Sequence, residues 1–165
     1  MASRFDRDGS YSLDERTAMP TRSARTAWTG GLQDGSGQVE LASSGVGKFD
    51  VSFPKRTADS AEGTTSPEEL IAAAHSSCYA MALSGQIGAA GGSIQSLDVN
   101  ADVTLGPDPA GGFRISTIKL TVRARVSGID AAAFEQAAQN AKAGCPVSKA
   151  LAGVETIELD AALEG

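Results

Sequence analysis

The chain has 165 residues, of which 41% are hydrophobic and 21% are charged, which is ordinary for one soluble globular domain with a core of its own. Its net charge of -6, with no basic stripe, argues against a nucleic-acid partner. No apolar run of about 18 residues is present, and the N-terminus lacks the apolar stretch of a secretory signal, so we expect no membrane span and a cytoplasmic location.

Residues 1–18 are polar and show neither helical nor strand periodicity. We therefore interpret them as a flexible leader or tag and expect a single domain over residues 19–165.

The first half of that domain predicts three short strands and a loop. A strand is expected around Trp28, a second around Val39 and a third over residues 48–53, since turn residues separate these segments. A polar loop over residues 55–65 contains Arg56.

A helix over residues 67–88 has the strongest start signal in the sequence. Ser66 can cap it, Pro67 suits its first position, and Glu69 completes a capping box. Its middle is small and apolar on all sides, which is typical of a buried helix. A small two-layer domain offers too little cover for such a helix, so the pattern favours burial in an oligomer.

The second half predicts two long strands, two helices and a last strand. Alternation indicates strands over residues 99–105 and 113–126, and a change of apolar phase indicates a β-bulge near Ser116. Asp130 caps a helix that Gly144 ends, Pro146 opens a short helix, and a strand follows over residues 157–161. The order β-β-β-α-β-β-α-α-β indicates an α+β fold.

Both cysteines have local contexts that bear on reactivity. Cys145 lies between Gly144 and Pro146, where it caps a helix whose N–H groups and dipole would stabilise a thiolate. Cys78 lies in the middle of the apolar helix, where burial makes a thiol inert unless a cation is supplied. Arg56 is a candidate for that cation. The alternative is two inert buried thiols.

Two further side chains near Cys78 are candidates. Glu68 is free to hold an arginine, but ten residues of helix, about 15 Å, separate it from Cys78. A shared site therefore requires a break in the helix or Glu68 of a partner subunit. His75, the only histidine, is better explained by packing or by an interface than by catalysis, and its spacing from the cysteines does not suggest a metal site.

The runs TSPEELIAAAHSSCYAMALSGQIGAAG, residues 65–91, and AKAGCPVSKAL, residues 141–151, closely resemble the OsmC/Ohr family and within it the OsmC branch. The resemblance implies an OsmC-like α+β fold that forms an intertwined homodimer, with long central cysteine-bearing helices flanked by antiparallel sheets. It also implies active sites at the subunit interface.

In that family the first cysteine, here Cys78, attacks an organic hydroperoxide, and the second, here Cys145, resolves the sulfenic acid as a disulfide. The resemblance further matches Glu68 with the family's glutamate and Arg56 with its active-site arginine. It implies a thiol peroxidase for oxidative and osmotic stress defence, with no bound cofactor and with an external dithiol reductant. Lipoylated proteins serve as that reductant in the Ohr branch, and we extend this by analogy.

Two other functions stay open at this point. One is a thiol–disulfide oxidoreductase acting on proteins, although the sequence has no Cys-x-x-Cys motif. The other is a dimeric stress protein that binds an apolar ligand and whose cysteines are incidental.

Overall fold

The computed structural model describes residues 19–164. The chain divides into two compact units, one ending at Phe53 and one beginning at Pro54, and each is described by itself. The predicted leader, residues 1–18, lies outside the described residues. A single domain over residues 19–165 stays a prediction.

The unit up to Phe53 is a three-stranded antiparallel sheet in the order β1-β2-β3, formed by β1 (Arg25–Thr29), β2 (Ser36–Glu40) and β3 (Lys48–Val51). All three predicted strands are confirmed. The turn between β1 and β2 requires glycine at Gly35, because a Cβ there would lie 2.2 Å from the carbonyl oxygen of Gly31.

The predicted loop after β3 begins with a short helix, α1 (Phe53–Arg56), so the loop prediction is wrong for its first residues. The long helix α2 (Pro67–Ala89) then begins as predicted. The Ser66 hydroxyl accepts a hydrogen bond of 3.1 Å from the Glu69 N–H, and Pro67 occupies the first turn. The Glu69 carboxylate accepts from the Thr65 hydroxyl and thus fixes the entry of the chain.

One side of α2 is buried within the chain and the other is not. His75, Tyr79, Leu83 and Ile87 are each 0% exposed, whereas Met81 on the outward side is 73% exposed. The prediction of a helix buried on all sides therefore does not hold for the single chain. The spacing of the buried residues, one every four positions, is that of a helix with one inward face.

The sheet of the second unit contains β4 (Ser93–Pro107), β5 (Phe113–Ser127) and β6 (Thr156–Leu163), with β5 in the middle. β4 is antiparallel to β5, but β6 is parallel to it, so this sheet is mixed rather than antiparallel. The reason is that α3 and α4 form a crossover that carries the chain back before β6. The predicted bulge is confirmed, since the pairing shifts from Thr104–Thr117 to Leu105–Ile115 and leaves Ser116 between them.

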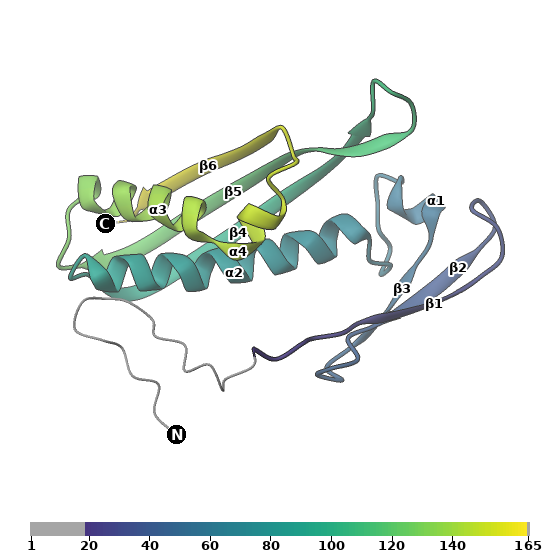
Figure 1. Cartoon of the computed structure of the whole chain (residues 1–165), viewed down its shortest axis with the longest axis horizontal. Coiled ribbons are helices and arrows are strands. Elements are labelled where there is room, and N and C mark those ends of the chain that lie inside the picture. Colours follow the sequence, from purple (N-terminus) through teal and green to yellow (C-terminus); the bar gives the residue numbers. More distant parts are fainter. Residues whose placement is uncertain (1–18, 165) are drawn as a thin grey trace. The chain divides into compact units, whose positions relative to one another are not determined.

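Helices α3 (Ala131–Gly144) and α4 (Pro146–Ala150) pack with α2 and the β4-β5-β6 sheet (Figure 1). Asp130 caps α3 by accepting from the Ala133 N–H at 2.8 Å, as predicted. The α+β fold is confirmed, and its core joins the inner faces of α2, α3 and β5. Within the described residues, the helices are too short or too polar to cross a membrane.

Candidate active site

The two cysteines, distant in sequence, lie side by side in the second unit. Their Sγ atoms are 3.2 Å apart, and both thiols are free. A disulfide bond is about 2.0 Å long, so a shift of roughly 1 Å would join the two sulfurs. Cys145 is 0% exposed, whereas Cys78 is only partly buried.

The position of Cys145 follows from the end of one helix and the start of the next. Its N–H still donates to the Ala141 carbonyl at 2.8 Å and closes α3, while Pro146 directly after it begins α4. Cys145 is therefore the N-cap of α4, as predicted, although its thiol closes no capping hydrogen bond in this structure. Packing of α4 against α2 brings it to Cys78.

The two thiols differ in acidity. Burial raises the pKa of Cys78, and the neighbouring Cys145 raises it further against a smaller opposing effect of the Val147 N–H. Burial also opposes ionisation of Cys145, but the N–H groups of Ser148 and Val147, the Ser148 side chain and the Cys78 thiol together lower its pKa. Within one chain, Cys145 is thus the more acidic thiol, in agreement with its position at a helix start.

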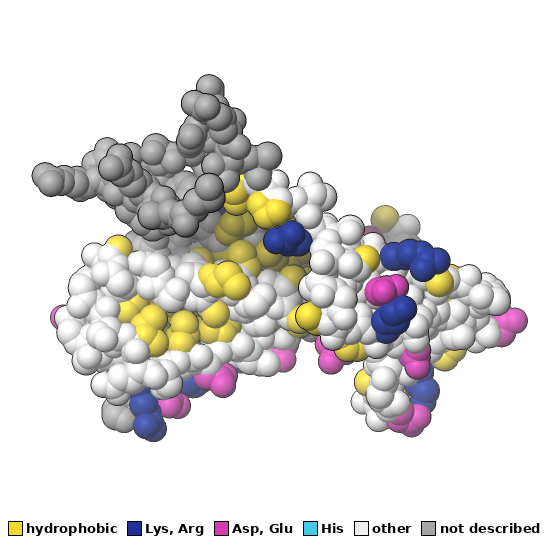
Figure 2. Space-filling view, turned by 90° about the horizontal axis from the view of Figure 1, so that it is seen from below, with side chains coloured by type: hydrophobic (Ala, Val, Ile, Leu, Met, Phe, Trp, Pro, Cys, Tyr) yellow, Lys and Arg dark blue, Asp and Glu magenta, His cyan; other side chains and the backbone are white. Residues whose placement is uncertain are grey.

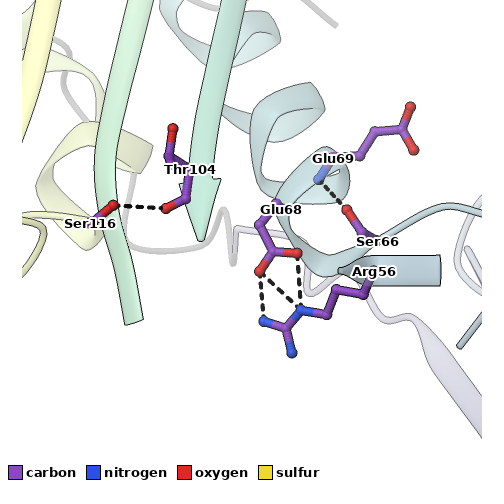
Figure 3. Close-up of polar contacts among 6 residues, drawn as sticks. All are labelled: Arg56, Ser66, Glu68, Glu69, Thr104 and Ser116. Carbon is purple, nitrogen blue, oxygen red and sulfur yellow. Dashed lines mark hydrogen bonds and ion pairs between the residues drawn. The ribbon is translucent and has the colours of Figure 1, made fainter. Parts of the chain in front are cut away.

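Arg56 and Glu68 form an ion pair at the start of α2 (Figure 3). Arg56 Nη2 lies 2.6 Å from Glu68 Oε1, and Arg56 Nε lies 3.0 Å from Oε2, which is a bidentate arrangement. Glu68 is buried, and its burial alone would raise its pKa, but the Arg56 guanidinium holds this pKa below its ordinary value. Glu68 in turn raises the pKa of Arg56.

The structure thus forms two pairs from the four predicted site residues, but it does not bring all four together within one chain. α2 runs unbroken from Pro67 to Ala89. Glu68 and Cys78 are therefore separated by about 15 Å along it, at the standard rise of a helix. Of the two ways to a shared site, a break in the helix is excluded, which leaves Glu68 of a partner subunit.

An open pocket of about 540 Å³ adjoins the Arg56–Glu68 pair. The last turns of β4 and the start of β5 contribute apolar side chains to its lining, among them Val103, Leu105 and Phe113. The Ser116 bulge lies at this end of the sheet, where its hydroxyl meets the Thr104 carbonyl (Figure 3). A guanidinium beside an apolar wall suits a ligand with one polar and one apolar end.

His75 is a packed residue, as predicted, and its partner is one that the sequence reasoning missed. Its Nε2 lies 2.8 Å from the hydroxyl oxygen of Ser148, and both side chains are buried. The signal was available in the spacing: His75 precedes Cys78 by three positions, and Ser148 follows Cys145 by three.

Comparisons with known proteins agree with this fold and this cysteine arrangement. The family profile described as OsmC-like protein matches residues 59–160. The chain belongs to the OsmC family. It is 42% identical over 131 residues to Peroxiredoxin OsmC of Escherichia coli, which covers 79% of this chain and 90% of that protein.

Two solved structures extend the likeness of this OsmC-family chain. The organic hydroperoxide resistance protein OhrB of Bacillus subtilis matches with a TM-score of 0.65 and 26% identity, covering 86% of this chain and 98% of that one. An organic hydroperoxide resistance protein from Elizabethkingia anophelis matches with a TM-score of 0.66 and 28% identity, covering 90% and 98%. The OsmC-like fold is therefore shared beyond the OsmC branch.

The Arg56–Glu68 pair predicts how stability depends on pH. Because the folded-state pKa of Glu68 is lowered, the pair stabilises the fold above the ordinary glutamate pKa of about 4.3, and this contribution is lost as pH falls through the lower folded-state value. Glu68→Gln should therefore be less stable than wild type at pH 7, and the difference should shrink towards pH 3. Urea unfolding at each pH measures this. Glu69→Gln, at the exposed neighbouring position, is the control, and an equal pH response of both variants would contradict the prediction.

Proposed function

We propose that this OsmC-family protein is a thiol-dependent peroxidase that reduces organic hydroperoxides, and less well hydrogen peroxide, to alcohols and water. The observation that carries the proposal is the 3.2 Å contact between the Cys78 and Cys145 sulfurs. Its 42% identity to a peroxiredoxin makes thiol peroxidase chemistry the expected use of such a pair. Incidental cysteines, by contrast, have no reason to meet.

The reaction has two thiol steps. The Cys78 thiolate attacks the terminal oxygen of the hydroperoxide, the O–O bond breaks, and the alkoxide leaves and takes a proton, so that Cys78 becomes a sulfenic acid. The Cys145 sulfur then attacks the Cys78 sulfur, and hydroxide leaves and takes a proton to form water. An external dithiol reduces the disulfide and restores both thiols.

Accessibility supports Cys78 as the residue that meets the peroxide. It is partly exposed, whereas Cys145 is fully buried behind it. The more acidic thiol in the single chain is Cys145, so Cys78 needs a cation to become a thiolate at neutral pH. In this proposal Arg56 is that cation, Glu68 orients it, and both come from a partner subunit, because the unbroken α2 keeps the chain's own pair away.

The outward side of α2 supports a homodimer. It presents Ala73, Ala74, Ser77, Gly85 and the exposed Met81, side chains small enough for a second helix to approach closely. Figure 2 shows hydrophobic side chains gathered on the body that contains α2, with charged side chains mainly towards its edges. A second copy would cover this side and complete the burial that the sequence of α2 indicates.

The apolar wall beside Arg56 supports an organic rather than an inorganic peroxide. Val103, Leu105 and Phe113 can contact an alkyl or aryl tail while the guanidinium faces the peroxide oxygens. Hydrogen peroxide has no tail to use these contacts. We further propose that the enzyme uses an external dithiol, of the lipoyl type by analogy, has no bound cofactor, and serves oxidative and osmotic stress defence in the cytoplasm.

Single-cysteine variants test the assigned roles. Cys78→Ser should consume no organic hydroperoxide above background, because the attacking thiolate is gone. Cys145→Ser should react once and accumulate the Cys78 sulfenic acid, because no thiol is present to resolve it. Peroxide consumption and mass spectrometry of the intact chain measure both. Full turnover by Cys78→Ser would disprove the peroxidase assignment and favour a binding protein with incidental cysteines.

A substitution on the outward side of α2 tests the dimer. A Cβ at Gly85 meets nothing within 4 Å in the single chain, and leucine favours a helix more than glycine does, so Gly85→Leu should not harm the fold of one subunit. It should separate the subunits and abolish peroxidase activity while the circular dichroism spectrum persists. Ala132→Leu, on the exposed side of α3, is the control. A fully active Gly85→Leu dimer would place the interface elsewhere.

A further inference from the structure

The hydrogen bond between His75 and Ser148 is a buried polar contact that the peroxidase chemistry above does not use. His75 is 0% exposed and Ser148 is 7% exposed, and their side chains meet at 2.8 Å. The second ring nitrogen of His75, Nδ1, is buried and has no hydrogen-bond partner among residues 19–164. Burying an imidazole with one unpaired nitrogen is unfavourable, which calls for a compensating role.

This contact runs beside the contact between the two sulfurs. On α2, His75 lies three residues before Cys78, and on α4, Ser148 lies three residues after Cys145. Residues three apart on a helix lie on one side of it. The two helices are therefore joined by two adjacent side-chain contacts, one of 2.8 Å and one of 3.2 Å, and the first fixes the alignment of the second.

The protons of this contact can be assigned from what each side chain offers. Burial lowers the pKa of His75, so the ring is neutral and carries one proton. With that proton on Nε2, the unpaired Nδ1 is only a lone pair, whereas the other tautomer would bury an N–H without an acceptor. His75 Nε2 then donates to the Ser148 oxygen. The Ser148 hydroxyl proton is left free to point towards Cys145, whose thiolate its side chain favours.

We propose that His75 and Ser148 are positioning residues of the resolving step: their hydrogen bond holds α4 in register on α2 and directs the Ser148 hydroxyl proton to the Cys145 sulfur. The inference rests on the proposed peroxidase cycle for its role, but not for its geometry. Cys145 is thereby held beside Cys78 as the thiolate that attacks its sulfenic acid. The S–S bond forms, the S–O bond of the sulfenic acid breaks, and the hydroxide that leaves is protonated to water.

The surrounding titratable groups leave this role to His75 and Ser148. Cys78 and Tyr79, both from α2, face Cys145, and Glu135 of α3 acts on Tyr79. Tyr79 donates its hydroxyl proton to the Ala138 carbonyl at 2.9 Å, and burial raises its pKa, so it stays neutral and committed to that bond. Lys149, the cation of α4, lies on the exposed side of that helix.

The first experiment needs no peroxide. In the Cys78→Ser chain, Cys145 is the only thiol, and its thiolate absorbance is followed against pH. Adding Ser148→Ala or His75→Leu should raise the pKa of Cys145 by about one unit, which means about tenfold less thiolate at neutral pH. Ser148→Thr keeps the hydroxyl and His75→Gln keeps a donor near Nε2, so both should retain most of the wild-type value.

The second experiment separates the two steps of the cycle. With both cysteines present, Ser148→Ala and His75→Leu should form the Cys78 sulfenic acid at the wild-type rate but convert it to the disulfide about tenfold more slowly at neutral pH, with recovery as pH rises. Rapid-mixing measurements with cumene hydroperoxide and a sulfenic-acid trap give both rates. Ser76→Ala, whose hydroxyl bonds only to its own helix at the Ala73 carbonyl, is the control.

Two results would overturn the inference. One is a Cys145 titration that is the same in Ser148→Ala, His75→Leu and Ser76→Ala. The other is an equal slowing of both steps, which indicates general loosening of the fold. If the wild-type chain forms no sulfenic acid, the proposed function fails by itself, and the peroxide-free titration still decides whether His75 and Ser148 set the state of Cys145.

Discussion

The unbroken helix α2 is the constraint on which the site depends. It carries Glu68 in its first turn and Cys78 in its middle, and its fixed rise keeps them about 15 Å apart. The same helix buries one side in its own chain and leaves Ala74, Ser77 and Met81 outside. Both facts point the same way: one subunit holds the thiols and half of the requirements for using them, and a second copy of α2 supplies cover and cation.

The acidity of the thiols explains why a second copy matters chemically. Within one chain the more acidic thiol is Cys145, since N–H groups at the start of α4 and the Ser148 side chain stabilise its thiolate, while burial keeps Cys78 protonated. Cys145 is fully buried and cannot meet a peroxide first. A resolving thiolate is thus prepared by local structure alone. The attacking thiolate at Cys78 depends on a cation brought from elsewhere, which ties turnover to assembly.

Local signals in the sequence predicted most of the second unit. Ser66 and Pro67 gave the start of α2, Asp130 the start of α3, and the phase change the bulge at Ser116, because each acts through neighbours in the chain. The parallel pairing of β6 and the short helix α1 were missed, since they depend on how the chain returns and packs. The Arg56–Glu68 pair was anticipated from the family resemblance, whereas the bond between His75 and Ser148 arises only when α4 packs on α2. Whether the four site residues act as assigned is a matter for experiment.

Subunit complementation tests the central claim, that Cys78 of one subunit works with Arg56 of the other, most directly. Cys78→Ser and Arg56→Met, each inactive alone, are expressed together. If the site is shared, each heterodimer contains one complete site, and random pairing should restore about a quarter of the wild-type peroxidase activity. If activity stays at the background of the two separate variants, while wild type expressed with Cys78→Ser remains active, the shared site is contradicted.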